Sequence, residues 1–372
     1  MSEYQFVQFI AIDRPLTDEQ MEFMQRQSTR ARISRREFTN EYHFGDFHGK
    51  SLEMMRHGFD LHVHFTDYGV RRLMFRLPAG LPCGTVAFRA FALKYNLEWT
   101  VDETGAGGVL MVQPESDGRM WDSYVDGLKD LLCKLTPVRE MLMAGDLRPL
   151  YLAWLACEPE EGKEPPVPAG LKQLPEALRN FANFFELNDD LLQAAATESA
   201  DVEDRPVPPL PVRQWLKSCT DSQRTELLEQ ILFDETGMVR ADTLAEIRKS
   251  QKIAAWPVTK SSRTIDDLRE LAEQQVAIRR AAETAAREQQ QQQRRKRMKE
   301  QPDETVEKMR NLVSQRSTQK YAEAVALLSE LLDVLGPEDG PPFTQAVAQQ
   351  LRKQVPGARG LVPMLKKSGF LK

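Results

Sequence analysis

The stretch Tyr4–Pro78, which begins with YQFVQFIAI (residues 4–12) and closes with RRLMFRLP (residues 71–78), decides the fold. Both alternating sets of side chains in residues 4–12 are largely apolar, which is typical of a strand buried on both faces. Residues 38–44 and 71–77 also alternate, so they predict two further strands, the first of them half-exposed. Two predicted helices lie between these three strands.

Each of the two helices has its own local signal. Thr17 and Gln20 have the spacing of a capping box, in which the hydroxyl accepts from the Gln20 N–H and the Gln20 side chain reaches back. This predicts a helix to about Ser28. A second helix is predicted over Ser51–Thr66, where apolar residues recur at helical spacing and a capping glycine follows. Those residues are Leu52, Met55, Phe59 and Gly69.

A further pair of strands is predicted at residues 97–102 and 109–113. The glycines between them, within residues 105–108, lead into a strand and not into a helix. A dinucleotide-binding loop requires the helix, because its N-terminus meets the phosphate. We therefore expect a hairpin turn here.

Several segments of the first half resemble a family of uncharacterised bacterial proteins. They are AIDRPL (11–16), GDF (45–47), FDLH (59–62), RRLMFRLP (71–78) and GDLRPLYLAWL (145–155). The resemblance covers about residues 1–196 and implies a bacterial, cytoplasmic setting, but no activity, substrate or site. Members of that family have Tyr or Trp where this chain has His43 and His64, which weakens a metal site built on those two. Residues 321–369 are also similar to helical tails of some bacterial zinc-finger proteins, without the zinc ligands.

The remainder of the chain is predicted to be helical. Thr136-Pro137 has the residue types of a helix start, and residues 198–211 are acidic and then proline-rich, which favours an extended linker. We expect an α+β fold, with a small mixed or antiparallel α/β sandwich followed by mainly helical domains. The predicted parts are an α/β domain (1–116), a helical domain packed on it (117–197), the linker (198–211), a helical region (212–301) with one long projecting helix (264–301), and a helical bundle (302–372).

The composition excludes some classes of protein. The 372 residues contain 50 Lys and Arg and 55 Asp and Glu, so the net charge of −5 provides no overall attraction to nucleic acid or membrane. No apolar run approaches ~18 residues, and the N-terminus lacks a basic region followed by an apolar run, so we expect neither a membrane span nor a signal peptide. The four cysteines form no C-x-x-C pair, which favours reduced thiols in a cytoplasmic protein.

The five histidines all lie between His43 and His64. If Ser51–Thr66 is helical, then His57, Asp60 and His64 share one helix face, and they are the candidate ligands of a divalent metal. The chain lacks the H-E-x-x-H signature, so the alternative is that these histidines are structural or partly exposed. Two interpretations are also open for Arg71, Arg72 and Arg76. They either form a patch that binds anions or pair with nearby carboxylates in local salt bridges.

A basic arm lies at the end of the predicted long helix. Its cations are Arg294, Arg295, Lys296, Arg297 and Lys299. Five cations in six residues can neutralise phosphates or bind an acidic protein partner, although no aromatic residues alternate with them to stack on bases. The third alternative is a solvated helix end, because this half of the helix has no apolar face.

The sequence has no G-x-S-x-G, P-loop or kinase pattern. We therefore expect a non-catalytic intracellular interaction or scaffold protein, such as a subunit of a larger bacterial assembly, with protein partners, no cofactor and no membrane. Two alternatives remain open. One is a nucleic-acid-associated protein that uses the basic arm, and the other is a metal-dependent enzyme that uses the histidines.

Overall fold

The computed structural model describes residues 4–43, 45–103, 107–115, 127–202, 211–233, 239–250, 255–356 and 360–371. The chain divides into two compact units, unit 1 (Met1–Gln275) and unit 2 (Val276–Lys372). The division therefore lies inside the predicted long helix and not in the proline-rich stretch 198–211, most of which lies outside the described residues. A search of the described residues for a membrane-spanning helix, with enough apolar residues in one stretch, finds none.

Unit 1 is built on an antiparallel sheet, which has seven strands in the described part of the chain. The sheet order is β2-β3-β1-β4-β5-β7-β6. Strand β1 pairs with β3 on one side, where Phe9 lies opposite Phe38, and with β4 on the other, where Phe9 lies opposite His62. The strands are β1 (Gln5–Ile10), β2 (Arg32–Ile33), β3 (Glu37–Tyr42), β4 (Leu61–Thr66), β5 (Arg71–Leu77), β6 (Leu97–Val101) and β7 (Gly108–Val112).

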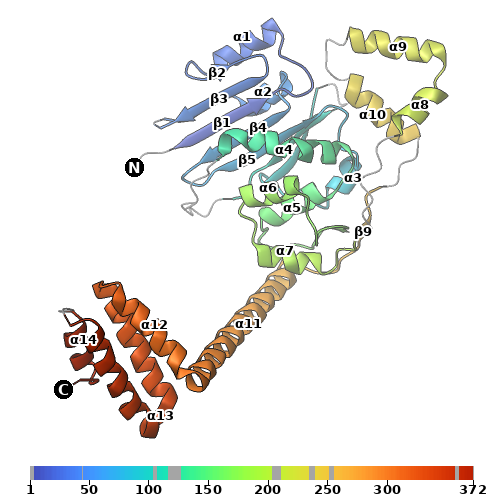
Figure 1. Ribbon diagram of the computed structural model, residues 1–372. Coiled ribbons are helices and arrows are strands. Elements are labelled where there is room, and N and C mark those ends of the chain that lie inside the picture. The colour runs from blue at the N-terminus through green and yellow to red at the C-terminus, as the bar shows by residue number, and fades with distance from the viewer. Residues whose placement is uncertain are drawn as a thin grey trace. The chain divides into compact units, whose positions relative to one another are not determined.

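Helices cover both faces of this sheet (Figure 1). Successive strand residues point to opposite faces, so Phe6 joins one hydrophobic cluster and its neighbour Val7 joins another. The cluster with Phe6 includes residues of α4 (Leu128–Met143), and the cluster with Val7 includes residues of α1 (Asp18–Gln27) and α2 (Ser51–Arg56). The predicted α/β sandwich is confirmed, and the capping box of Thr17 and Gln20 opens α1.

The second predicted helix is wrong beyond its first turns. Helix α2 ends at Arg56, and Leu61–Thr66 form strand β4, between β1 and β5. Gly58 has φ of +137°, a conformation that side chains other than glycine rarely adopt, and a Cβ there would lie 2.7 Å from Leu16 Cδ2. The helix therefore stops, and Leu61, Val63 and Phe65 alternate into the core.

Further helices extend the core of unit 1, the first of them between β5 and β6 and the others after the sheet. They are α3 (Gly84–Phe88), α5 (Arg148–Ala156), α6 (Glu176–Phe184) and α7 (Asp189–Ala196). Helix α4 continues through Pro137, so the predicted helix start at Thr136-Pro137 is wrong. Its buried stripe continues across the proline from Leu135 to Val138 and Leu142, and burial outweighs the lost backbone hydrogen bond.

Three more helices of unit 1 follow, α8 (Val212–Ser218), α9 (Asp221–Leu232) and α10 (Val239–Ser250), and the chain then returns to the core of this unit. Strand β9 (Val258–Thr259) pairs antiparallel with β8 (Val167–Pro168), which lies in the loop between α5 and α6. Ile265 and Leu268, at the start of α11 (Ile265–Glu300), join the same core as α4. This return explains why residues 255–275 belong to unit 1.

Unit 2 has a separate hydrophobic cluster. Unit 2 contains the rest of α11, together with α12 (Pro302–Ser314), α13 (Thr318–Gln354) and α14 (Leu361–Lys367). Gly336 interrupts α13 with a non-helical conformation, φ +82° and ψ −177°, so two helical stretches lie on either side of it. Residues 277–297 of α11 are exposed, but Met298 is buried in the cluster and holds the end of α11 against the bundle.

Candidate functional site

The three predicted metal ligands do not share a helix face, because the helix is not formed. His57 caps the C-terminus of α2, whereas Asp60 precedes β4 and His64 lies within it. At ~3.3 Å per strand residue, the backbone positions of Asp60 and His64 are about 13 Å apart. Within the described part of the chain, no group of three or more His, Cys, Asp or Glu side chains is placed to hold a metal ion.

Asp60 is fully engaged in a buried charge network. One carboxylate oxygen accepts from the backbone N–H groups of Ile12 and Asp13 at 2.7 and 3.0 Å. The other accepts from Arg76 and Arg139, each at 3.3 Å. Asp60 and Arg139 are 1 % and 0 % exposed, so this carboxylate is a structural anchor and has no free lone pair for a metal.

Arg139 connects this network to the sheet. Its guanidinium donates to both carboxylate oxygens of Asp13, at 3.2 and 2.6 Å, and to the backbone carbonyl of Arg76 at 2.8 Å. Burial alone would lower the pKa of Arg139, but the negative charges of Asp60 and Asp13 outweigh it and raise the pKa. The side chain therefore stays charged in the interior.

The histidines of β4 are neutral and packed. The His62 ring stacks on Phe9 with centroids 3.8 Å apart, and His62 Nδ1 lies 3.1 Å from the Gln8 carbonyl. Burial, then the charges of His64 and Arg72, hold the pKa of His62 well below its usual range. Burial and Arg72 likewise lower the pKa of His64 to about 4. Structural histidines, the alternative to a metal site, fit these contacts.

The three arginines of β5 do not form an anion patch. Arg71 is buried and is held by the Phe184 carbonyl and by Glu186, with the carboxylate at 2.5 Å. Arg72 donates to Gln113, and Arg76 pairs with Asp60. These contacts attach the strand to its neighbours within unit 1.

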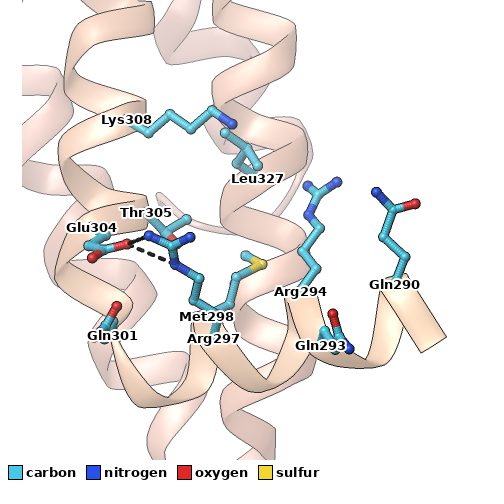
Figure 2. A pocket seen from close by; sticks show the side chains of 10 residues that line it. All are labelled: Gln290, Gln293, Arg294, Arg297, Met298, Gln301, Glu304, Thr305, Lys308 and Leu327. Atoms are coloured by element: carbon cyan, nitrogen blue, oxygen red, sulfur yellow. Dashed lines mark hydrogen bonds and ion pairs between the residues drawn. The ribbon is translucent and has the colours of Figure 1, made fainter. Parts of the chain in front are cut away.

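The basic arm is divided between different sides of α11. At about 100° per residue, Arg294 and Arg297 share one side of the helix, whereas Arg295, Lys296 and Lys299 point elsewhere. Figure 2 shows Arg294 and Arg297 beside a groove between α11, α12 and α13. We call this feature the basic groove. Its lining residues are Gln290, Gln293, Arg294, Arg297, Met298, Gln301, Glu304, Thr305, Lys308 and Leu327.

The basic groove has a volume of about 570 Å³. Arg297 binds Glu304 across it through two nitrogens, at 2.8 and 3.1 Å, and Arg294 binds Glu330 at 2.5 Å. Both arginine side chains remain more than half exposed, at 56 % and 72 % for Arg294 and Arg297. Three cationic side chains and one carboxylate line the groove, so its net charge is positive.

Helix α9 presents a feature that the sequence analysis missed. None of its residues is buried, although a capping box of Thr220 and Gln223 begins the helix. Four large apolar side chains on and just after its last two turns are more than half exposed. We call them the α9 stripe: Leu228 (60 %), Ile231 (54 %), Leu232 (76 %) and Phe233 (78 %). The i, i+3, i+4 spacing of Leu228, Ile231 and Leu232 was the available signal, but such spacing alone cannot separate a buried face from an unpartnered one.

Comparisons of this chain with protein-family models, with curated proteins and with solved structures find no match. The resemblance of residues 1–196 to a bacterial family therefore remains a prediction.

Proposed function

We propose that this protein is a non-catalytic interaction protein that binds a protein partner through the α9 stripe. The single observation that supports this proposal is the exposure of four large apolar side chains on one short helix. Scattered apolar residues are normal on a protein surface, but a contiguous group is typical of an interaction site. The proposed setting is the cytoplasm, which fits the four free cysteines.

Helix stability supports the same proposal. Helix α9 has 12 residues, and isolated helices of that length are marginal in water. Burying a Leu, Ile or Phe side chain is worth roughly 1.5–3 kcal/mol. A partner that covers the α9 stripe would stabilise both the helix and the complex.

The charges beside the stripe indicate what the partner surface looks like. Glu229 is exposed next to Leu228 on the same helix, and Arg224 is already paired with Asp221 at 3.2 Å. An apolar groove with Lys or Arg at its rim complements this arrangement, because opposite charges steer association and fix the register. Helix-in-groove binding by spaced apolar anchors is a common recognition mode.

The neighbouring helix α10 is attached to the sheet domain, so α9 is presented from a fixed base. Arg240 on α10 pairs with Asp13 at 3.3 Å and with Glu140 at 3.5 Å. Ile247, also on α10, is fully buried. The attachment leaves the stripe on α9 accessible.

Affinity purification after chemical cross-linking, in cells that produce the protein naturally, tests this proposal. We expect the wild-type chain to recover a protein cross-linked to residues 221–233, and the double variant Leu228→Ser/Leu232→Ser to lose it. Because both leucines are exposed, the free energy of unfolding of the variant should differ from that of the wild type by no more than about 0.5 kcal/mol.

The matched control is Glu226→Ser/Gln230→Ser, which changes two residues on the opposite side of the same helix. It should recover the same partner as the wild type. Equal recovery by wild type and Leu228→Ser/Leu232→Ser would refute the proposal. Sedimentation at several concentrations identifies the case in which the partner is a second copy of this chain.

A further inference from the structure

We infer that the basic groove of unit 2 is a second binding site, and that it takes an acidic protein segment in which carboxylates flank an apolar residue. The inference concerns a different unit and a partner of opposite charge character from the one proposed for the α9 stripe. It is carried by the arrangement of cations, amides and apolar side chains in one groove.

The cations of the groove come from two helices that face each other. Arg294 and Arg297 extend from α11, and Lys308 extends from α12 (Figure 2). Lys308 is exposed and forms no ion pair with any residue that the structure describes. A carboxylate entering the groove would therefore meet a free ammonium group and two guanidinium groups, which bind carboxylates with planar, paired hydrogen bonds.

The ion pairs already present are exchangeable. Arg297 and Glu304 are 72 % and 54 % exposed, and exposed pairs of this kind contribute little to stability. A carboxylate of the partner can replace Glu304 at Arg297, or Glu330 at Arg294, with a small loss of intramolecular energy. The resident carboxylates thus mark the positions that partner carboxylates would occupy.

The floor and rim of the groove fit a polypeptide. Met298 and Leu327 supply an apolar contact between the cations, and Met298 is itself held in the core of unit 2. Side-chain amides of Gln290 and Gln293 lie along the same side of α11, and Gln301 follows the last residue of that helix. Such amides both donate and accept hydrogen bonds, as a peptide backbone requires.

The same features argue against nucleic acid as the occupant. No aromatic side chain lines the groove, so no surface is available for base stacking. The remaining cations of the arm, Arg295, Lys296 and Lys299, lie on other sides of α11 and do not extend the groove into a phosphate track.

A binding titration on the full chain tests this inference. The probe is a fluorescently labelled peptide of glutamates with a central leucine, titrated at low and at high salt. We expect saturable binding that weakens with salt, and that weakens at least about tenfold in the triple variant Arg294→Glu/Arg297→Glu/Lys308→Glu. The same peptide with serine in place of leucine should bind more weakly.

The matched control is Arg295→Glu/Lys296→Glu/Lys299→Glu, which makes the same change in net charge on other sides of α11. Its dissociation constant for the peptide should be within about twofold of the wild-type value, because the three substituted side chains lie outside the groove and solvent screens their charges. Equal losses in the two triple variants, or no binding of the peptide by the wild type, would overturn the inference. Tighter binding of single-stranded or duplex DNA that depends on Arg294, Arg297 and Lys308 would also overturn it, in favour of nucleic acid.

The two proposals fail separately. Leu228→Ser/Leu232→Ser should bind the acidic peptide like the wild type, because its changes lie in unit 1. Loss of peptide binding in that variant would contradict an independent second site.

Discussion

At the residue scale, the buried charge network of Arg139 is the most sensitive point of unit 1. Arg139→Leu leaves the carboxylates of Asp13 and Asp60 buried without their main cation. Removing one partner of a buried ion pair typically costs about 3–5 kcal/mol. We expect a loss of that size in the free energy of unfolding, measured by urea denaturation followed by circular dichroism.

Arg240→Gln is the control for this prediction. Arg240 also pairs with Asp13, at 3.3 Å, but its side chain is 55 % exposed. Exposed ion pairs contribute about 0–1 kcal/mol to stability, so the free energy of unfolding of this variant should remain close to that of the wild type. Equal destabilisation by the two substitutions would show that burial of Arg139 does not determine how much its ion pairs contribute to the free energy of unfolding.

His64 gives unit 1 a pH dependence. Its pKa is about 4 in the folded protein, against about 6.5 in an unfolded chain, because of burial and the nearby charge of Arg72. The unfolded state therefore binds the proton first, and stability falls as the pH is lowered from about 6.5 to 4. This ring accounts for roughly 3 kcal/mol of that loss at most.

The substitution His64→Gln tests the pH dependence, since glutamine has no titratable proton. We expect the free energy of unfolding to fall less between pH 6.5 and 4 in the variant than in the wild type. Measurements at pH 8 are the control, because the imidazole is neutral in both states there. Parallel pH profiles for the two proteins would contradict a neutral, buried His64.

At the element scale, local signals predicted the starts of helices better than their ends. The capping box of Thr17 and Gln20 is confirmed. The predicted long helix 264–301 agrees with α11, Ile265–Glu300. In each case the decisive interactions lie within one turn or one helix, so the sequence contains them.

The wrong predictions depend on partners that are distant in sequence. Residues 61–66, LHVHFT, alternate apolar and polar side chains as a strand does, a signal that the predicted helix overlooked, and pairing with β1 and β5 fixes the strand. Helix α4 passes Pro137 because its apolar stripe packs on the sheet. The helix face that His57, Asp60 and His64 were predicted to share is absent, because α2 ends at Arg56.

The candidate surfaces follow the same rule. The sequence marked Arg294 and Arg297 as basic, but the groove exists only because α12 and α13 fold back beside α11. The α9 stripe has a visible spacing, whereas its exposure depends on what the rest of the chain leaves uncovered. In both surfaces the sequence predicts the residue types, but it does not predict which helices lie beside them or how exposed they are.

At the scale of the whole molecule, each unit has a hydrophobic core of its own. The clusters of unit 1 extend only to residue 272, and the cluster of unit 2 begins at Met298. We therefore predict that damage to one core leaves the other intact. Leu328 is fully buried in unit 2, and Leu328→Ala should cost about 2–5 kcal/mol there, through lost burial and the cavity that remains.

Hydrogen exchange followed by mass spectrometry locates this effect, because it reports local opening along the chain. Leu328→Ala should speed exchange in α12, α13 and α14 and leave β1, β4 and β5 at wild-type rates. The reciprocal control is Val63→Ala on β4, a fully buried residue that should affect the sheet alone. If either substitution accelerated exchange throughout both units, the two cores would form one cooperative system, and the division at Gln275–Val276 would not be a division in stability.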